Sequence, residues 1–443
     1  MTQTSHSDDR SAARSRPLKV LLLSLYHPEI VRGGAQQVCF DLFSELEERD
    51  DVDATLLAAI DPSLSAFYKT GAVITGFDGR DRQFLYLSRD YDYQWHKTSS
   101  RRAVEALAEF LRITNPDVVH VHHFLLFGID VLTLIRRTVP GARIVFTFHE
   151  FMALCHADGH LLRRTDGSIC PGPSMVRCSQ CFPDLAHSYF FLREQWFRRH
   201  LQSADVLTVP SPFMIDRWRT FGLDADRIVC VSNGLPEASM DPVRETEHHE
   251  RQTFGFFGQL VDVKGVGLIL EAVDILARQG FDAYCIEING DNLRFASDAL
   301  RHRVEDAMAE AAGGAPRAAP IAFNGAYGRA DLQRRMRRVD WCLIPSLWPE
   351  THCLVLSEAW AHGVVPIAAD VGALGDRISH DKNGLLFSVG DAHSLADAIR
   401  RAASDPDLRA RLAGAAPAQM TAREMTNAYL SVYRDAFTPA AQA

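Results

Sequence analysis

The sequence predicts an α/β protein built from two doubly wound domains that face each other across a cleft. Short apolar runs rich in β-branched residues alternate with amphipathic helical patterns, which indicates parallel sheets with right-handed helical crossovers. This alternation stops at a polar, non-periodic stretch, residues 235–252, and then starts again. The chain has 443 residues, which is enough for two cores of ordinary size.

The first domain is expected at residues 17–238, after a polar and disordered tail at residues 1–16. Its strands are predicted where apolar residues run almost without interruption, because strands of a parallel sheet are buried on both faces. They are Leu18–Tyr26, Asp117–Phe124, Arg143–Glu150, Ala204–Ser211 and Arg227–Gly234. A helix is predicted at Gln36–Glu48, where apolar residues recur on one face.

The second domain is expected at residues 239–415, with the stretch 235–252 as the linker. Its predicted strands are Gln252–Leu260, Tyr284–Asp291, Ile321–Tyr327, Trp341–Ser346 and Val364–Asp370, and its helices Gly267–Gln279, Ala330–Val339 and His393–Ala403. A last helix at Ala422–Phe437, within the segment 416–443, is expected to pack back on the first domain. Doubly wound sheets bind ligands at the carboxyl ends of their strands, so the site is expected in the cleft.

Composition and charge exclude several classes of protein. A formal net charge of -9 and a pI near 6.0 argue against a nucleic-acid-binding protein, which usually carries a basic surface. No apolar run reaches the ~18 residues of a membrane span, and the polar N-terminus lacks a secretory signal, so we expect a cytoplasmic protein with reduced cysteines. The aromatic and basic segment Tyr189–Gln202 either packs on the sheet, which we favour, or makes peripheral contact with the inner face of a membrane.

Two turns suit the binding of a phosphate. Gly33 and Gly34 follow the first strand and open the first helix, where the backbone can approach a ligand and the helix start favours an anion. Gln259 and Lys264 occupy the same place in the second domain, and the lysine can meet a phosphate as a point charge. A tight turn or a solvated lysine explains either one alone, but their equivalent places in two domains favour a ligand.

Two glutamates flank the start of a predicted helix: Glu350 precedes it and Glu358 lies inside it. The residues at the helix start are His352, Cys353, Leu354 and Val355. Free amides of a helix start can hold a diphosphate, and a carboxylate can hold the hydroxyls of a ribose. The arrangement suits a nucleotide sugar, although Glu358 alone is equally well explained as a surface residue.

Together these motifs resemble the retaining glycosyltransferases of family four, whose GT-B fold consists of two Rossmann-like domains facing across a cleft. The likeness rests on the spacing of Glu350 and Glu358, the Gly-Gly turn and the segment "GQLVDVKG". The stretches Val209–Pro236 and Asn383–Leu412 are also similar to that family. The resemblance covers nearly the whole chain, from Pro17 to about Tyr433.

The resemblance implies a retaining, metal-independent hexosyltransferase. It would move a hexose from a nucleotide diphosphate sugar to a glycan or lipid-linked acceptor in polysaccharide or glycoconjugate biosynthesis. It implies that Glu358 binds the ribose, Glu350 lies near the donor sugar and Lys264 meets the diphosphate, while Gly34 lets the first turn approach the donor phosphates. No cofactor is implied for catalysis, because the leaving phosphate oxygen can itself take the proton of the acceptor.

The chain departs from the family pattern at two places. The family often has an arginine where this chain has Gln259, so one phosphate cation is missing, and either Lys264 with the helix amides suffices or another arginine substitutes. The family also commonly has a small-aromatic-glycine pattern where this chain has Thr351–Cys353. His352 and Cys353 are therefore expected to shape the sugar pocket differently.

Histidines gather at the ends of two predicted strands: His120, His122 and His123 end one, and His149 ends the next. Side chains alternate along a strand, so His120 and His122 share a face. The resemblance points to His122 as the residue beside the reacting centre and the acceptor, with His149 as the next acceptor contact. His120 lies nearer the middle of its strand and fits a structural role.

A segment rich in glycine and proline, residues 151–183, follows directly after His149 and holds four of the nine cysteines. These are Cys155, Cys170, Cys178 and Cys181. A closing Cys-x-x-Cys with two further thiols suits a structural zinc site, with His156 and His160 as alternative ligands, and free thiols or a redox pair explain the pattern equally well. An ordered loop of this length needs a reason, and we expect it to wall the acceptor pocket.

Two other functions stay open. A nucleotide-sugar epimerase on the same fold would release an altered sugar without using an acceptor. A non-catalytic binding protein derived from a transferase would keep the fold, and Gln259 and Thr351–Cys353 give that interpretation its support.

Overall fold

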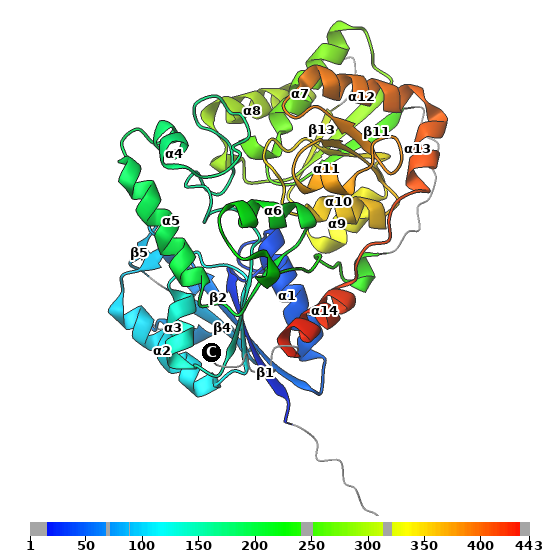
Figure 1. Cartoon of the computed structure of the whole chain (residues 1–443). Coiled ribbons are helices and arrows are strands. Elements are labelled where there is room, and N and C mark those ends of the chain that lie inside the picture. The colour runs from blue at the N-terminus through cyan, green and yellow to red at the C-terminus, as the bar shows by residue number, and fades with distance from the viewer. Residues whose placement is uncertain (1–15, 68–70, 88, 241–250, 313–320, 435–443) are drawn as a thin grey trace, which may run out of the picture.

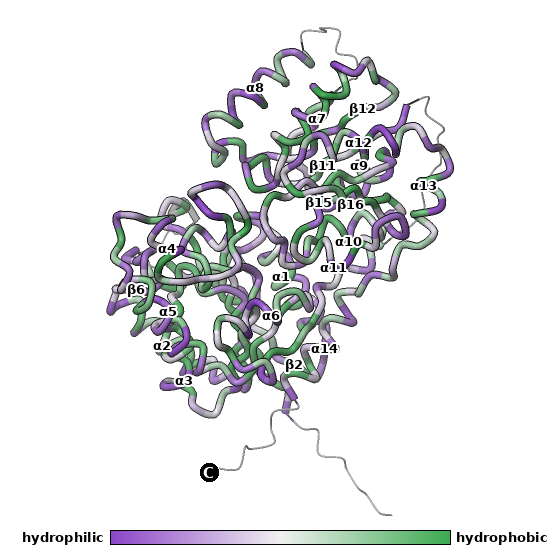
Figure 2. The backbone as a smooth tube through the Cα atoms, turned by 45° about the horizontal axis from the view of Figure 1, so that its top comes forward, coloured by the Kyte–Doolittle hydropathy of each residue, from purple (hydrophilic) through white to green (hydrophobic). Residues whose placement is uncertain are grey.

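The computed structural model describes residues 16–67, 71–87, 89–240, 251–312 and 321–434. The chain forms two α/β lobes, and each lobe is built around its own sheet (Figure 1). The strands run through the interior of the lobes and are rich in buried apolar residues, while polar residues are frequent in the outer helices and loops (Figure 2). The prediction of two doubly wound domains is confirmed.

The N-terminal domain contains an eight-stranded sheet in the order β10-β9-β8-β7-β1-β2-β4-β3. Its strands pair in parallel except for β3 with β4. They are β1 (Leu18–Leu25), β2 (Val52–Ile60), β3 (Ile74–Gly76), β4 (Gln83–Leu87), β7 (Val118–Val121), β8 (Arg143–Thr147), β9 (Val206–Val209) and β10 (Ile228–Cys230). A small hairpin, β5 (Tyr91–Asp92) and β6 (Lys97–Thr98), stands apart.

Helices cover both faces of this sheet, because the apolar side chains of β1 alternate between the faces. Leu21 and Leu23 pack with residues of α2, α3, α5 and α6, whereas Val20 and Leu22 pack with residues of α1 and α14. The helices are α1 (Gly34–Glu47), α2 (Arg101–Thr114), α3 (Val131–Thr138), α4 (Met175–Cys181), α5 (His187–Leu201), α6 (Pro212–Thr220) and α14 (Ala422–Arg434).

The C-terminal domain contains a parallel six-stranded sheet in the order β13-β12-β11-β14-β15-β16. Its strands are β11 (Gln252–Phe257), β12 (Tyr284–Asn289), β13 (Ile321–Gly325), β14 (Trp341–Ile344), β15 (Val365–Ala369) and β16 (Leu385–Phe387). The chain builds one side of β11 first and then crosses to its other side at β14. The turns that follow β11 and β14 therefore border the crevice where doubly wound sheets bind ligands.

One apolar cluster joins this sheet to its helices, with Ile269, Trp341, Leu356 and Ile399 among its fully buried members. The helices are α7 (Val266–Arg278), α8 (Asp298–Ala312), α9 (Arg329–Met336), α10 (Leu354–Ala361), α11 (Ala373–Arg377), α12 (Ala392–Ser404) and α13 (Pro406–Ala413).

The last helix, α14, leaves the C-terminal domain and lies beside α1 of the N-terminal domain (Figure 1). Where the chain returns, Leu235 and Thr421 form a parallel bridge. The N–H of Leu235 donates to the carbonyl of Met420 at 2.9 Å, and the N–H of Ala422 donates to the carbonyl of Leu235 at 2.7 Å. Two crossings between the domains therefore run side by side. Residues 241–250 of the predicted linker and 1–15 of the predicted tail lie outside the described residues.

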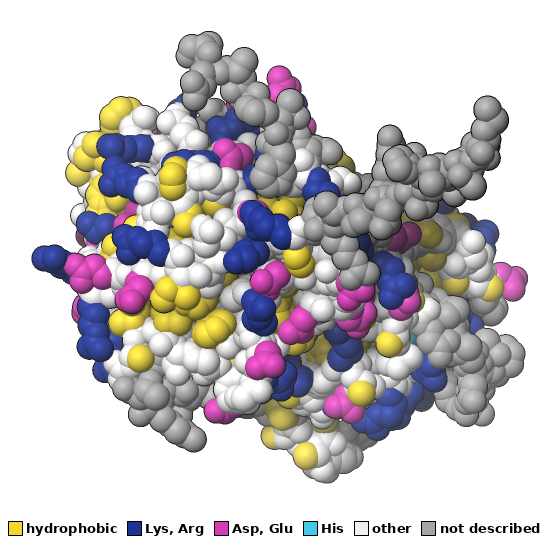
Figure 3. Space-filling model, turned by 90° about the horizontal axis from the view of Figure 1, so that it is seen from below, with side chains coloured by type: hydrophobic (Ala, Val, Ile, Leu, Met, Phe, Trp, Pro, Cys, Tyr) yellow, Lys and Arg dark blue, Asp and Glu magenta, His cyan; other side chains and the backbone are white. Residues whose placement is uncertain are grey.

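The surface gives two further facts. Among the residues that the structure describes, no helix is long and apolar enough to cross a membrane. On the face shown in Figure 3, lysine and arginine side chains are interspersed with aspartate and glutamate over the described part. That face offers no broad basic surface for a nucleic-acid backbone.

Candidate functional site

A cavity of about 770 Å³ lies between the two domains. The N-terminal domain contributes the turn after β1 and the residue His149 after β8, and the C-terminal domain contributes the turns after β11 and β14 and the start of α10. The structure brings these predicted residues together in its walls: Gly33, Gly34, His149, Gln259, Lys264, Glu350, His352, Cys353, Leu354, Val355 and Glu358.

The glycine turn of the first domain lies against the start of α10. A Cβ added to Gly34 would stand 3.6 Å from Cδ1 of Leu354, which is ordinary van der Waals contact. The two elements that the sequence predicts for anion binding, one in each domain, therefore meet in the same cleft.

Lys264 ends a short 3₁₀ turn, η4 (Asp262–Lys264), that follows β11. The next residue, Gly265, has a φ of 74°, and a Cβ there would lie 1.9 Å from the carbonyl oxygen of Pro345. Only glycine fits this position, because it needs both a left-handed backbone and a close approach. The contact presses the turn after β11 against the turn after β14, which carries Glu350.

The carboxylate of Glu350 is held by three donors on one oxygen. Nζ of Lys264 donates to Oε1 at 2.6 Å, Oγ of Ser346 at 2.7 Å and Nε1 of Trp348 at 3.0 Å. Burial alone would lower the pKa of Lys264, but the adjacent Glu350 raises that pKa above its usual value. Lys264 is therefore charged at neutral pH. Oε2 of Glu350 takes no hydrogen-bond donor from the described residues.

Glu358 lies inside α10 and lines the cavity with part of its side chain. Burial raises the pKa of its carboxyl to about 7, which the nearby Arg329 opposes and Asp41 reinforces. At neutral pH this group can either donate or accept a hydrogen bond, as recognition of a diol requires.

An arginine from each domain forms a hydrogen bond with the opposite domain across the cleft. Nη2 of Arg329, the first residue of α9, donates to Oδ1 and Oδ2 of Asp41 on α1 at 3.0 and 2.8 Å. Nη1 of Arg32 donates to the carbonyl of Tyr327 at 3.0 Å. Arg32, Arg294 and Arg329 all line the cavity, although the sequence analysis does not identify them. Only Arg32 carries a signal in the sequence, because it directly precedes the Gly-Gly turn.

The start of α10 has an unusual backbone. Cys353 is the N-cap of α10, and its backbone lies at φ 66° and ψ 87°. Residues other than glycine rarely adopt this left-handed conformation. Burial raises the pKa of its thiol to about 12, so this cysteine is not a nucleophile at neutral pH. The amides of the first turn of α10 have no partner inside the helix, and Leu354 and Val355 line the cavity.

The histidines lie at different depths from the cavity. His149 lines the cavity, whereas His122 is 1% exposed and lies behind it, with its Nδ1 3.0 Å from Nε2 of His149. His120 has partners on both ring nitrogens, Tyr433 at 2.7 Å and Thr147 at 2.6 Å. Burial keeps the pKa of His120 and of His122 well below the usual value and lowers that of His149 to about 3, so all three rings are neutral.

The predicted zinc site stays a prediction, because the described residues do not form a metal-binding group. Cys155, Cys170, Cys178 and Cys181 line one small cavity within the segment 151–183, and all four thiols are free. In the part of the chain that the structure describes, no group of three or more histidine, cysteine or acidic side chains could hold a metal ion. His156 and His160 do not complete such a group. The four thiols lie around the same small cavity, but they do not converge on a common point where a metal ion could bind.

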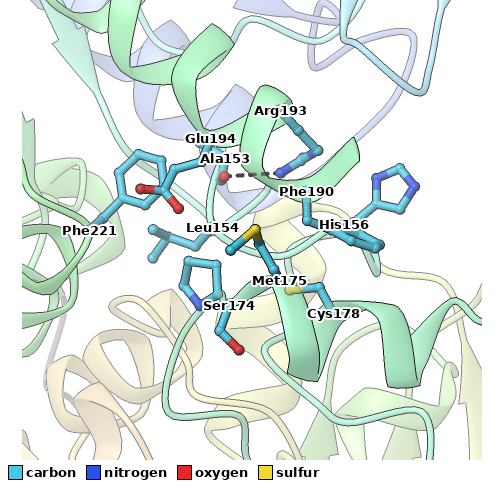
Figure 4. A pocket seen from close by; sticks show the side chains of 11 residues that line it. Ala153, Leu154, His156, Ser174, Met175, Cys178, Phe190, Arg193, Glu194 and Phe221 are labelled. Atoms are coloured by element: carbon cyan, nitrogen blue, oxygen red, sulfur yellow. Dashed lines mark hydrogen bonds between the residues drawn. The ribbon is translucent and has the colours of Figure 1, made fainter. Parts of the chain in front are cut away.

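The cysteine segment is fixed to α5 and reaches the cleft. Nη1 of Arg193 donates to the carbonyl of Ala153 at 3.1 Å (Figure 4). Its Nη2 donates to the carbonyl of Met152. At the other end, the ring of His160 packs edge-on against Trp348 with 5.7 Å between centroids. The segment therefore spans from α5 to the turn that carries Glu350.

Comparison with known proteins agrees with this architecture. Residues 32–238 match the model for Glycosyltransferase Family 4, and residues 241–419 match that for Glycosyl transferases group 1. A D-inositol 3-phosphate glycosyltransferase of Corynebacterium glutamicum is 31% identical over 228 residues, which are 48% of this chain and 52% of that protein. A phosphatidyl-myo-inositol mannosyltransferase of Mycolicibacterium smegmatis is 28% identical over 197 residues, 44% of this chain and 47% of that protein.

The chain thus spans about half the length of the curated relatives it matches. Among solved structures, HepE of Anabaena in complex with UDP superposes with a TM-score of 0.65 at 15% identity, covering 94% of this chain and all of that one. At this identity the likeness shows the fold. The two family models match in order, one over each domain, so the chain carries a Glycosyltransferase Family 4 domain followed by a Glycosyl transferases group 1 domain on a GT-B fold.

Proposed function

We propose that this chain is a retaining glycosyltransferase that moves a hexose from a nucleoside diphosphate sugar to a hydroxyl of a glycan or lipid-linked acceptor. One observation carries the proposal: a single cavity between the domains is shared by Lys264, Glu350, Glu358 and the start of α10. HepE, which has the same fold, binds UDP, and this supports a nucleotide donor here.

The cavity walls suit each part of such a donor. The ammonium of Lys264 and the first amides of α10 would hold the diphosphate, and Glu358 would accept hydrogen bonds from the ribose hydroxyls. Glu350 is held by its neighbours through Oε1, so its Oε2 can accept a hydrogen bond from a hydroxyl of the hexose. A guanidinium of Arg32 or Arg294 would supply the positive charge that Gln259 does not.

The proposed reaction needs no nucleophile from the protein. The bond between the anomeric carbon and the phosphate oxygen breaks, the acceptor oxygen bonds to that carbon on the same face, and the leaving phosphate oxygen takes the acceptor proton. Lys264 and the α10 amides stabilise the negative charge on the leaving diphosphate, which is a role that pre-oriented donors fill well. We therefore propose catalysis that is independent of a metal ion.

His149 is the side chain from the first domain best placed to contact the acceptor, because it lines the cavity. Its neutral ring can donate or accept one hydrogen bond at each nitrogen, and one of these is taken by His122. The names of the two curated relatives describe inositol acceptors, which supports a polyol hydroxyl as the acceptor group here.

The test is a panel of UDP-, GDP-, ADP- and TDP-sugars in thermal-shift assays, with chelator present throughout. A ligand at 100 times its Kd stabilises the folded protein by about 2.7 kcal/mol, so one base should raise Tm clearly. The variant Glu358→Ala should lose that shift, and the surface variant Glu109→Ala should keep it. No shift with any donor would contradict the proposal, and an altered free sugar formed without acceptor would favour an epimerase.

A further inference from the structure

Thr351, the residue directly after Glu350, forms hydrogen bonds to the opposite domain through both its side chain and its backbone carbonyl. Oγ1 of Thr351 donates to the carbonyl oxygen of His149 at 3.0 Å, and Oγ of Ser211 donates to the carbonyl oxygen of Thr351 at 2.6 Å. His149 follows β8 and Ser211 follows β9, so both partners lie at strand ends of the N-terminal domain. One threonine of the C-terminal domain therefore contacts two neighbouring strand ends of the other domain.

The next residue repeats the arrangement. Nε2 of His352 lies 3.0 Å from Oγ of Ser232, on the segment that leads out of the N-terminal domain. Nη1 of Arg377, from the same domain as His352, donates to the carbonyl of His352 at 2.6 Å. The His352 side chain is thus bonded to one domain while its backbone is bonded to the other.

The two hydrogen bonds of Thr351 are buried. Thr351 is 8% exposed, and Ser211 and His352 are each 2% exposed. A buried hydroxyl or carbonyl that loses its partner costs more than the hydrogen bond contributed, because water does not replace that partner fully until the domains separate. Small relative movements of the two domains at this point are therefore disfavoured.

We propose that Thr351, assisted by His352, is an interdomain latch that fixes Glu350 relative to His149. The latch acts on position and not on chemistry: the threonine hydroxyl holds the backbone carbonyl of His149, and its neighbour Glu350 faces the same cavity. These two residues are positioning residues for the transfer. The inference rests on the proposed function for its kinetic consequence, but the latch itself is a property of the empty protein.

The contact with the His149 carbonyl needs a hydroxyl at position 351. A valine has the shape of threonine without the donor, and a serine keeps the donor with less bulk. Thr351→Val should therefore release the latch and Thr351→Ser should retain it. Ser211→Ala removes the matching donor from the opposite domain and should reproduce the effect of Thr351→Val, which covers the case in which that variant folds poorly.

The test measures amide hydrogen exchange by mass spectrometry in the full chain without ligand. In Thr351→Val and Ser211→Ala, peptides over residues 149–152 and 351–354 should exchange at least about fivefold faster than in the wild type, since opening exposes both. Thr351→Ser and the exposed control Thr220→Val should match the wild type. Wild-type exchange in both releasing variants, or equal effects of valine and serine at position 351, would overturn the latch.

Kinetics separate the latch from the proposed function. With a donor found by the panel, Thr351→Val should bind the nucleotide with an unchanged Kd while kcat falls at least about tenfold, and Thr351→Ser should restore kcat. A variant with weaker nucleotide binding and unchanged kcat would show a role in the donor site and reject positioning. If the wild type binds no nucleotide, the proposed function fails, while the exchange rates still decide the latch.

Discussion

The side chain of Glu350 is held in one orientation by its neighbours. Three donors converge on Oε1, so neither rotation of the carboxylate nor withdrawal of Lys264 is free. Such an arrangement fixes the direction of the second oxygen before a ligand arrives, which lowers the entropy lost on binding.

Lys264→Met tests this constraint. The methionine keeps the apolar stem and removes the ammonium, leaving a carboxylate that is 6% exposed with only two neutral donors. We expect the free energy of unfolding at pH 7 to fall by roughly 1–3 kcal/mol. Denaturant titration of this variant, beside Lys382→Met at an exposed position, measures the effect. Equal stability of the two variants would show that the pair contributes nothing.

Glu358 should make stability depend on pH. Its folded pKa is raised by burial to about 7 from the ordinary 4.5, so the folded state binds the proton more tightly. The resulting stability is full below about pH 4.5 and is lost as pH rises through 7. Relative to the wild type, Glu358→Gln should therefore gain about 1–3 kcal/mol between pH 4.5 and 8. Denaturation across that range checks this, and the exposed Glu109→Gln should show no such trend.

Among the helices, α10 begins in a conformation that its own sequence disfavours. Cys353 has a side chain at a φ of 66°, where a glycine would be relaxed. The surrounding contacts therefore impose this backbone, and the carbonyls of His352 and Cys353 are both bonded by Arg377. The strain lies at the turn that the proposed donor would occupy.

Two substitutions at this position should reverse the usual order of helix propensities. Cys353→Gly and Cys353→Ala both remove the thiol, but only glycine removes the left-handed strain. We expect the glycine variant to be more stable than the alanine variant by about 1 kcal/mol, as judged by chemical denaturation. If alanine proves the more stable, position 353 is not held in the left-handed region.

For the two domains together, the ion pair between Arg329 and Asp41 is the charged contact that crosses the cleft beside Glu358. The side chain of Asp41 is 7% exposed, so it relies on Arg329 and on Gln37 for partners. Burial raises the pKa of Asp41, and Arg329 counteracts this, which shows that the carboxylate depends on its cation.

Arg329→Gln should loosen the domain arrangement. Without the guanidinium, the Asp41 carboxylate can be hydrated only if the cleft widens. The radius of gyration in small-angle X-ray scattering should therefore increase. Arg334→Gln, on the same helix and in an exposed pair with Asp331, is the matched control and should leave the scattering unchanged. Identical scattering from both variants would mean that the pair does not hold the cleft.

The sequence was sufficient to predict the fold and insufficient to predict the contacts between the domains. Lys264 and Glu350 follow β11 and β14, which are adjacent strands, so motif spacing alone places them in one crevice. Arg329 and Asp41, in contrast, are brought together only by the relative placement of two domains, which no local periodicity encodes. The depth of His122, which lies behind His149, was also not predictable, because strand alternation gives the face of a side chain and not its distance from the cavity.

The paired crossings at Leu235 and Thr421 limit how the two domains can move relative to each other. With a single connecting segment, one domain could rotate relative to the other about the axis of that segment almost without restraint. The two connections here are hydrogen-bonded to each other, and they pack so closely that a Cβ on Gly234 would collide with the Thr421 carbonyl. The pair therefore resists twisting and leaves bending across the two connections as the easy motion. Opening should therefore follow one axis, which separates the Arg329 side of the cleft most and the Ser232 side, next to the pivot, least.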